Sequence, residues 1–307
     1  MLFFFRRKAG ETGRIGDKTY AESWYINLQI TIGLDIGGST TKVVGFQDQD
    51  LLGKTMVKAS DPITSTYGGI GRFLSLNDLK LHDVKQVFMT GVGSSYIDKN
   101  ILGLPTQTVD EFNSVGLGGL YLTGLDRAIV VSMGTGTSLV SASRQGGKHI
   151  IGTGLGGGTL LGLSKAILGI HDFGLISELA EEGDLDNIDL TIGDLTPRAI
   201  PGLKADITAS NFGKMNDQAE NPDLARGIVN LVFQSVGTAA ILASRLEDLS
   251  DIVFVGSLLR MHAGRKSLDG FADLYQKNIL IPDDAEFATA MGAALSGLTD
   301  ANHRWKK

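Results

Sequence analysis

Two short glycine-rich turns, each at the end of a buried strand, constrain the fold of this chain more than any other feature. The first lies in residues 31–42, Thr-Ile-Gly-Leu-Asp-Ile-Gly-Gly-Ser-Thr-Thr-Lys, and the second in residues 130–139, Val-Val-Ser-Met-Gly-Thr-Gly-Thr-Ser-Leu. A glycine pair in a hairpin lets backbone N–H groups approach an anion, because no Cβ stands in the way. The hydroxyl residues that follow add donors for phosphate oxygens. Two such hairpins indicate a duplicated scaffold that holds one nucleotide from two sides.

Composition narrows the class of protein. The 307 residues allow two domains, and 42% hydrophobic with 20% charged residues is typical of a soluble globular protein. A net charge of -6 without a long basic run argues against a nucleic-acid partner. The chain has no cysteine, which excludes disulfides, iron–sulfur clusters and thiolate zinc sites and favours a cytoplasmic location. No apolar stretch is long enough to span a bilayer, so no membrane partner is expected.

The order of apolar runs and turns predicts an α/β protein in two halves. Residues 1–29 have no clear period and are expected to form a loosely ordered extension, followed by an N-terminal half, 30–125, and a C-terminal half, 126–307. Strands are expected near 28–36, 41–46, 51–58, 84–90, 106–109, 127–133, 138–143, 149–151, 251–255 and 279–281. Helices are expected near 66–76, 94–101, 110–125, 160–170, 175–182, 222–249, 257–278 and 288–298. Strands followed by crossover helices give each half its own sheet.

Two other nucleotide-binding motifs fit less well. Residues 152–157 match Gly-X-Gly-X-X-Gly, but no strand ending in an acidic residue follows at the distance that a dinucleotide fold requires. Gly53-Lys54-Thr55 ends like a phosphate-binding Walker loop, yet Asp48 stands where the leading glycine should be. The run 152–158 opens a helix, whose unpaired N–H groups and dipole favour an anion.

Several polar residues are candidates for chemistry. Asp35 ends the first strand, where a carboxylate can hold Mg²⁺ beside phosphates, and Lys42 follows the turn. Glu111 opens a helix and could take a proton from a substrate hydroxyl, or it could simply stabilise the helix N-terminus. Gly256, before Ser257, would let an adenine or ribose pack flat against the backbone. A lone histidine such as His149 is most often structural or a surface residue.

In this order the motifs resemble the sugar kinase, heat-shock protein and actin superfamily, and within it the type II (eukaryotic-like) pantothenate kinases. The resemblance covers residues from about 30 to 298. It rests on Asp35-Ile-Gly-Gly-Ser-Thr-Thr-Lys42, Glu111-Phe112, Gly152-Thr-Gly-Leu-Gly-Gly-Gly-Thr159, Glu182-Gly-Asp184, Ile207-Thr-Ala-Ser-Asn-Phe-Gly213, Phe254-Val-Gly-Ser-Leu-Leu-Arg260 and the Ala-Met-Gly-Ala-Ala run at 290–294. It implies two actin-like (ribonuclease H-like) halves, each a mixed sheet flanked by helices, with the nucleotide in the cleft between them.

The resemblance also implies ATP-dependent phosphorylation of the primary hydroxyl of pantothenate, the first step toward coenzyme A. Glu111 would be the general base, and Asp35 would bind Mg²⁺. The implied ATP-binding residues are Gly37, Gly38, Ser39, Thr40, Lys42, Gly134, Thr135, Gly136, Thr137, Gly156, Gly157, Gly158, Gly256 and Ser257. Ser132, His149, Gly152 and Thr153 would bind pantothenate. A homodimer that uses the long helix 222–249 and regulation by coenzyme A or acyl-CoA are further implications.

One residue departs from the family pattern. Family members carry an arginine that contacts pantothenate where this chain has His149, and a histidine offers neither the fixed charge nor the planar fork of an arginine. Two alternatives therefore stay open: a non-catalytic relative that binds nucleotide or acyl-CoA, and a kinase of another small alcohol. A related activator ATPase of radical dehydratases begins with a similar hairpin but needs cysteines, which this chain lacks.

Overall fold

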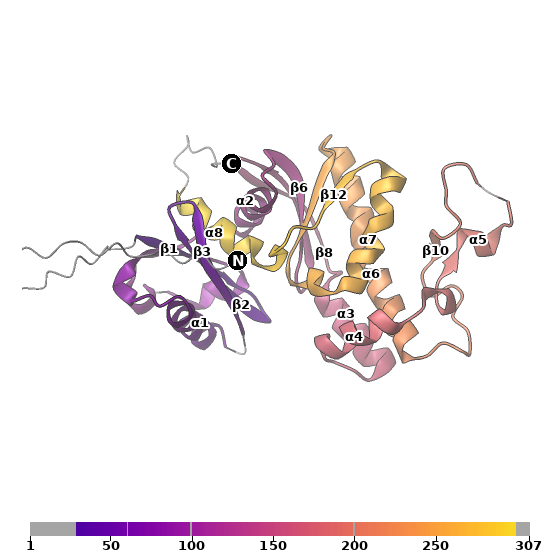
Figure 1. The fold of residues 1–307 in the computed structure, drawn as a ribbon, viewed down its shortest axis with the longest axis horizontal. Coiled ribbons are helices and arrows are strands. Elements are labelled where there is room, and N and C mark those ends of the chain that lie inside the picture. Colours follow the sequence, from indigo (N-terminus) through magenta and orange to yellow (C-terminus); the bar gives the residue numbers. More distant parts are fainter. Residues whose placement is uncertain (1–28, 60, 99, 199, 299–307) are drawn as a thin grey trace, which may run out of the picture.

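A computed structural model describes residues 29–59, 61–98, 100–198 and 200–298, so residues 1–28 of the expected extension lie outside it. The described chain forms two five-stranded mixed sheets (Figure 1). The first holds β1 (Ile30–Ile36), β2 (Thr40–Gln47), β3 (Asp50–Lys58), β4 (Val84–Thr90) and β5 (Thr106–Thr108). The second holds β6 (Arg127–Met133), β7 (Thr137–Ser143), β8 (Gly146–Thr153), β11 (Asp251–Val255) and β12 (Asn278–Leu280).

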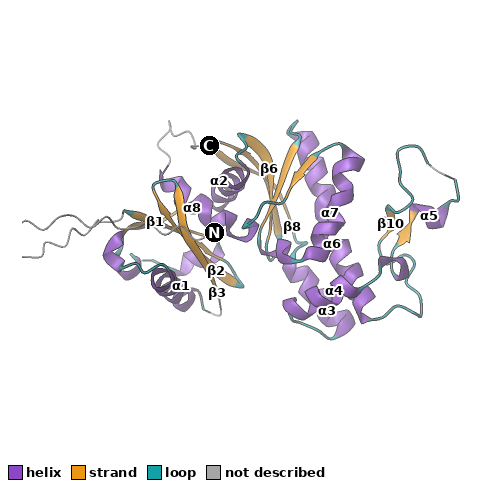
Figure 2. Cartoon of the chain, viewed as in Figure 1, coloured by secondary structure: helices purple, strands orange, loops and turns teal. Residues whose placement is uncertain are grey.

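The two sheets have the same connectivity. Their strand orders are β3-β2-β1-β4-β5 and β8-β7-β6-β11-β12. In the first, β1 runs antiparallel to β2 and parallel to β4; in the second, β6 runs antiparallel to β7 and parallel to β11. The glycine hairpins join β1 to β2 and β6 to β7, at equivalent places. The predicted α/β fold of two halves, each a mixed sheet flanked by helices, is therefore confirmed (Figure 2).

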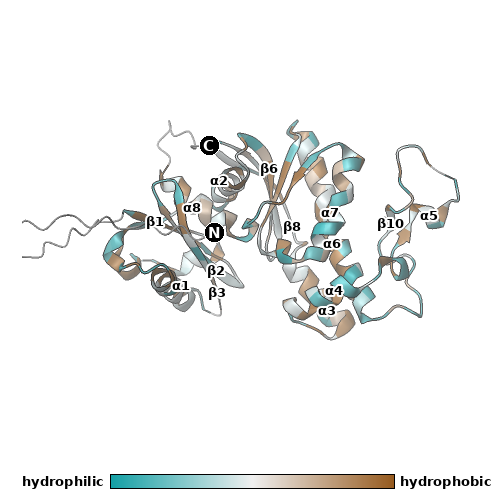
Figure 3. Ribbon diagram, in the orientation of Figure 1, coloured by the Kyte–Doolittle hydropathy of each residue, from teal (hydrophilic) through white to brown (hydrophobic). Residues whose placement is uncertain are grey.

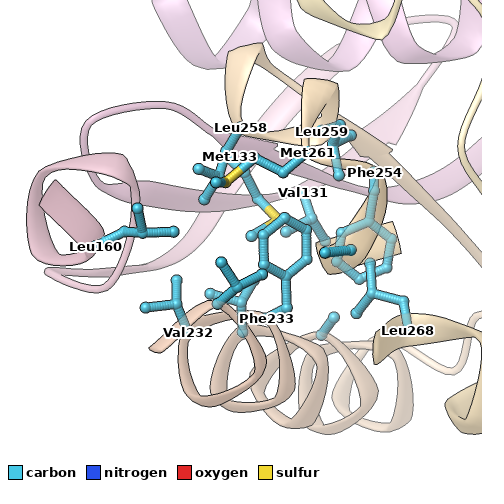
Figure 4. Close-up of a cluster of buried hydrophobic side chains, with 14 of the residues drawn as sticks. Val131, Met133, Leu160, Val232, Phe233, Phe254, Leu258, Leu259, Met261 and Leu268 are labelled. Atoms are coloured by element: carbon cyan, nitrogen blue, oxygen red, sulfur yellow. The ribbon is translucent and has the colours of Figure 1, made fainter. Parts of the chain in front are cut away.

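Helices cover both faces of each sheet. On the first sheet, α1 (Pro62–Leu76) places Ile70 and Phe73 against the fully buried side chains of Ile30, Ile32 and Leu34. On the second, α6 (Asn221–Leu246) packs against β6 and β11, and α3 (Gly157–Leu168), α4 (Phe173–Glu182) and α7 (His262–Tyr275) surround it. Figure 4 shows the resulting core around Phe233 and Phe254.

The inner faces of the sheets are covered by two helices that cross each other, α2 (Glu111–Thr123) and α8 (Ala288–Leu298) (Figure 1). Each packs on the sheet of the other half: α8 lies on β1 and β4, and α2 lies on β7 and β8. Small residues permit this crossing, because a Cβ on Gly118 would lie 1.8 Å from the carbonyl oxygen of Ala288. A Cβ on Gly292 would lie 1.7 Å from the carbonyl oxygen of Ser114.

Helix α6 is long and apolar enough to cross a membrane by length and composition. In the structure 67% of its most apolar 18-residue window is buried. In Figure 3 the strands carry mixed colours, and the hydrophilic colour is common on the loops beside β10. The apolar character of α6 is thus accounted for by its place in the core of the second half, where Val232, Phe233 and Val236 are fully buried.

Some segments differ from the expectations. The helix expected at 94–101 is replaced by two short 3₁₀ turns, Val92–Tyr96 and Ile101–Gly103. Between α4 and α6 the chain forms an arm with β9 (Leu190–Thr191), α5 (Ile192–Leu195) and β10 (Thr208–Ser210), which no periodic pattern predicts and which projects beyond α6 (Figure 1). The remaining 3₁₀ turns are Leu81–Asp83, Leu185–Asn187, Ser257–Arg260 and Ala285–Phe287. The division into 30–125 and 126–307 stays a prediction, since α2 and α8 each pack on the other half.

Candidate active site

The first hairpin presents an exposed turn at the end of β1. Gly37 donates its N–H to the carbonyl oxygen of Thr40 at 3.0 Å, which closes the turn. Gly38 and Ser39 at its tip are exposed, and a Cβ on Gly38 would meet no atom within 4 Å. The carbonyl oxygen of Ser39 accepts a hydrogen bond from the N–H of Ala59 at 3.0 Å. The turn is therefore anchored at its base and open to a ligand at its tip.

A buried ion pair lies directly behind this turn. Asp35 and Lys42 are register partners on β1 and β2, and Lys42 Nζ donates to Asp35 Oδ2 at 2.8 Å. Their side chains are only 11% and 9% exposed, respectively. A buried charge without its partner is costly, at about 3–5 kcal/mol, so each residue fixes the position of the other.

Glu111 lies beside this pair, at the first position of α2. Asp110 caps the helix, and its Oδ1 accepts the N–H of Asn113 at 2.7 Å. The Glu111 side chain is exposed, yet the protein around it partly desolvates the carboxyl and raises its pKa; the negative charges of Asp35 and Asp110 raise it further, against the opposing effect of Lys42. Glu111 thus lies within electrostatic range of Asp35 and Lys42, although it is 76 positions from Asp35 in the sequence.

The second hairpin and the glycine run form one tightly packed unit. Gly157 and Gly158, at the start of α3, donate their N–H groups to the carbonyl oxygens of Gly134 and Thr135 at 2.8 and 2.9 Å. A Cβ on Gly156 would lie 2.6 Å from the Thr135 oxygen, so only glycine allows this approach. These two N–H groups are consequently satisfied within the protein and are not the unpaired donors that the sequence suggested. A role of 156–158 in shaping a nucleotide site stays a prediction.

The remaining ATP-site candidates of this region lie in the same unit. Gly134 donates its N–H to the carbonyl oxygen of Gly136 at 2.9 Å, which closes the second turn as Gly37 closes the first. Thr137 is buried, and its hydroxyl donates to the carbonyl oxygen of Leu155 at 2.8 Å. Thr135, at the tip, is exposed. This turn is therefore open at its tip and held from behind by the glycine run.

The candidate substrate residues lie on β6 and β8. Gly152 and Thr153 pair with β7, and a bulge at Ile150 shifts the register so that His149 faces Val140. A β-bulge changes the direction in which nearby side chains point. The imidazole of His149 stacks on the ring of Phe112, with the ring centroids 4.1 Å apart and 26° between the ring planes. The stack joins β8 to the residue that follows Glu111.

The duplicated fold relates two residues that the sequence did not connect. Thr90 pairs with Asp35 at the end of β4, and Val255 pairs with Ser132 at the end of β11, so Ser132 occupies the position in the second half that Asp35 occupies in the first. Each pair is followed by a glycine with positive φ, 89° at Gly91 and 106° at Gly256.

Gly91 is a residue that sequence reasoning missed. A Cβ on Gly91 would lie 2.9 Å from Asp35 Oδ1, and one on Gly256 would lie 2.4 Å from the Met133 carbonyl oxygen. Both glycines therefore combine a left-handed backbone with a close approach to the neighbouring strand. The signal was present in the sequence, because a strand followed by Gly-Val-Gly mirrors the strand before Gly256-Ser257.

Two cavities lie apart from the hairpin turns. One, of about 810 Å³, is lined by Asn113, Arg127, Ser141, Ala142, Ser143, Gln145, Gly146, Gly147 and Lys148. The other, of about 490 Å³, lies in the arm between Asp189 and Lys214. Glu111 and the two hairpin turns line neither of them, so the candidate site is defined by its side chains and turns.

The fold places this protein in the class built from two actin-like halves. The Fumble family model matches residues 127–294, more than half of the chain, and the chain belongs to this family. The type II pantothenate kinase of Staphylococcus aureus strain MRSA252 is 29% identical over 278 residues, covering 87% of this chain and 99% of the relative. The enzyme of strain USA300 is 29% identical over 274 residues, covering 85% and 97%.

Solved structures support the fold alone, because their identities are low. The (R)-2-hydroxyglutaryl-CoA dehydratase component A of Acidaminococcus fermentans has a TM-score of 0.65 at 17% identity and covers 87% of this chain and 97% of its own. A ROK family glucokinase from Streptomyces griseus, in complex with glucose and AMPPNP, has a TM-score of 0.55 at 15% identity, with coverage of 87% and 98%. Both have the two-half architecture described above.

The charge of Asp110 gives a prediction for the pH dependence of a reaction that uses Glu111. Because Asp110 raises the pKa of Glu111, Asp110→Asn is expected to move the acid limb of the kcat profile to lower pH. Asparagine caps a helix about as well as aspartate, so α2 should be retained. Asp172→Asn, at the cap of α4, is the matched control and should leave the limb in place. An unshifted limb in Asp110→Asn would show that Glu111 does not control it.

Proposed function

We propose that this protein phosphorylates the primary hydroxyl of pantothenate with ATP, giving 4′-phosphopantothenate and ADP, the first step of coenzyme A biosynthesis. The observation that carries the proposal is the carboxyl of Glu111, with its raised pKa, beside the buried Asp35–Lys42 pair. Membership of the Fumble family and the type II pantothenate kinases that align over almost their whole length support it.

On the acceptor side, Glu111 is the proposed general base. The acceptor oxygen forms a bond to the γ-phosphorus while the bond from that phosphorus to the oxygen of ADP breaks, and the hydroxyl proton passes to a carboxylate oxygen of Glu111. A carboxylate with a raised pKa holds this proton more tightly than an ordinary glutamate. Ser132, His149, Gly152 and Thr153 are proposed to bind pantothenate.

On the nucleotide side, the open turn tips are proposed to bind phosphates through Gly38 and Ser39 of the first turn and Thr135 of the second. Gly37, Thr40, Gly134, Gly136 and Thr137 are proposed to belong to the same ATP site by holding the two turns in shape. Lys42 contributes the positive charge behind the first turn. The segments Gly156–Gly158 and Gly256-Ser257 are proposed to line the nucleotide by close backbone approach. Positioning and charge stabilisation account for most catalysis of phosphoryl transfer.

Asp35 fits a magnesium ion. Mg²⁺ usually binds through one or two carboxylates, several waters and the substrate phosphates. Phosphates and waters are proposed to supply the other ligands of such an ion. When bound, Mg²⁺ neutralises charge on the phosphates. Asp35 would hold it, and Lys42 keeps that carboxylate in place.

Further proposals concern assembly and location. We propose a homodimer in the cytoplasm, with coenzyme A or acyl-CoA as a regulator and without nucleic-acid or membrane partners. Leu242 and Leu246 on α6 are 61% and 73% exposed, which supports a contribution of this helix to a dimer interface. The eukaryotic-like subtype and the half boundaries at 30–125 and 126–307 are proposals of the same kind.

A turnover assay tests the function. The purified full chain with Mg²⁺, ATP and pantothenate is expected to release ADP and to form 4′-phosphopantothenate, detected by mass spectrometry. ADP release with another alcohol from a substrate panel, but not with pantothenate, would favour a kinase of that alcohol, an outcome that His149 makes worth testing. Nucleotide or acyl-CoA binding without turnover of any alcohol would identify a non-catalytic relative.

A further inference from the structure

Asn113 joins three separate parts of the fold at the start of α2. Its Oδ1 accepts the N–H of Gly147, in the first residues of β8, at 3.2 Å. Its Nδ2 donates to the hydroxyl of Ser296, in the last turn of α8, at 3.3 Å. Its own N–H is held by the Asp110 cap. One partly buried side chain therefore connects the first turn of α2 to β8 and to α8.

The backbone around Asn113 is packed to leave room for these bonds. A Cβ on Gly146 would lie 2.6 Å from Asn113 Oδ1, and one on Gly147 would lie 2.3 Å from the carbonyl oxygen of Phe112. Neither glycine can be enlarged without moving Asn113 or the helix backbone. The contact between α2 and the β7–β8 turn is thus a close one, with the amide of Asn113 at its edge.

This contact lies between two proposed functional residues. Glu111 is two residues before Asn113 on α2, and His149 is two residues after Gly147 on β8. The stack of Phe112 on His149 is a second link between the same two elements. The hydrogen bond from Gly147 to Asn113 and this stack together set where Glu111 stands relative to the strand that carries the proposed acceptor site.

We propose that Asn113 is a positioning residue that holds the Glu111 carboxylate in register with β8. The proposal rests on the proposed function, because it assigns Asn113 to the geometry of that reaction. In this proposal Asn113 acts on the reaction through the first turn of α2, and its hydrogen bonds to Gly147 and Ser296 hold that turn in place. A misplacement of about 1 Å at a reacting group can cost 10²-fold in rate.

The test is Asn113→Ala, with Asn77→Ala as the matched control. Asn77 is also an asparagine at a helix end, and its Nδ2 donates to the carbonyl oxygen of Phe73 at 2.8 Å, on the outer helix α1. Asn113→Ala is expected to lower kcat about 10- to 100-fold with the KM for ATP unchanged, and Asn77→Ala to leave kcat within about threefold. The Tm of both variants is measured as well. If the two lose stability to a similar extent, a lower kcat in Asn113→Ala alone is due to the position of Glu111 and not to general destabilisation. A kcat for folded Asn113→Ala that matches Asn77→Ala overturns the proposal.

A second readout does not depend on turnover. Partial desolvation of the exposed Glu111 side chain and the charges of Asp35 and Asp110 raise the pKa of its carboxyl, so a first turn that moves away from β8 should change that pKa. Carbon-13 NMR titration of the glutamate carboxyls, with Glu111→Gln to assign the signal, is expected to show this shift in Asn113→Ala and none in Asn77→Ala. An unmoved Glu111 pKa in folded Asn113→Ala contradicts the proposal, whereas a shifted pKa in a chain without kinase activity contradicts only the proposed function.

Ser296→Ala separates the two side-chain bonds of Asn113. It removes the hydroxyl that accepts from Nδ2 and leaves the bond from Gly147 to Oδ1 in place. We expect kcat to stay within about threefold of wild type, because the link to β8 is the one that orients Glu111. A loss as large as that of Asn113→Ala would assign the effect to α8 and overturn the proposed role of the β8 bond.

Discussion

Glu111→Gln is expected to lower kcat for pantothenate phosphorylation by about 10²- to 10⁴-fold, the usual contribution of a general base. Glutamine keeps the shape of the side chain but cannot accept the hydroxyl proton. ATP binding should persist, because the glycine turns and Lys42 are unchanged. The measurement is ADP release at saturating ATP and pantothenate, together with nucleotide affinity by calorimetry. Equal turnover in the variant and the wild type would exclude Glu111 as the base.

The same variant has a predicted effect on stability. The pKa of Glu111 is raised in the folded state, so its protonated form is favoured by folding. That contribution is fully present below the unfolded pKa of about 4.3 and is lost as the pH rises through the folded pKa. Glu111→Gln, which is always neutral, is therefore expected to have a higher Tm than wild type near pH 7, with a difference that shrinks toward pH 4. A lower Tm at pH 7 would contradict the raised pKa.

Gly118→Ala is expected to lower the free energy of unfolding by about 3 kcal/mol or more. This is the upper end of the usual cost of adding a methyl group to a well-packed core. The new Cβ would lie 1.8 Å from the carbonyl oxygen of Ala288, and backbone at a helix crossing cannot move aside cheaply. The measurement is the free energy of unfolding from denaturant titration. Gly68→Ala in α1 is the control: no atom lies within 4 Å of its Cβ, so it should gain up to about 1 kcal/mol from helix propensity. Equal stability of the two variants would show that the crossing is loose.

The fold was predictable where the signal is local. The hairpins at 37–40 and 134–137 and the apolar strands before them lie next to each other in the sequence, and the structure has both. The helix expected at 94–101 was wrong: the 3₁₀ turn Val92–Tyr96 ends at Ile97, whose backbone is extended, and a second turn follows at Ile101–Gly103. The chain therefore turns twice there.

The candidate site was less predictable, because its geometry depends on long-range packing. Glycines at 118 and 292 look like weak helix residues in the sequence, and only the crossing of α2 with α8 explains them. Asn113 belongs to no motif, and its partners at 147 and 296 are far away in the sequence. The proximity of Glu111 to Asp35 also arises from this packing, as does the use of the α3 N–H groups by the second hairpin.

The exchange of α2 and α8 between the halves has a consequence for folding during synthesis. The first sheet emerges from the ribosome early, but its inner face stays uncovered until residues 288–298 have been made. Gly33 of β1, for example, packs so closely on α8 that a Cβ on Gly33 would lie 2.1 Å from the carbonyl oxygen of Ala290. This contact can form only after Ala290 has been synthesised. Formation of the last helix, α8, is therefore the step that completes the core of the first half.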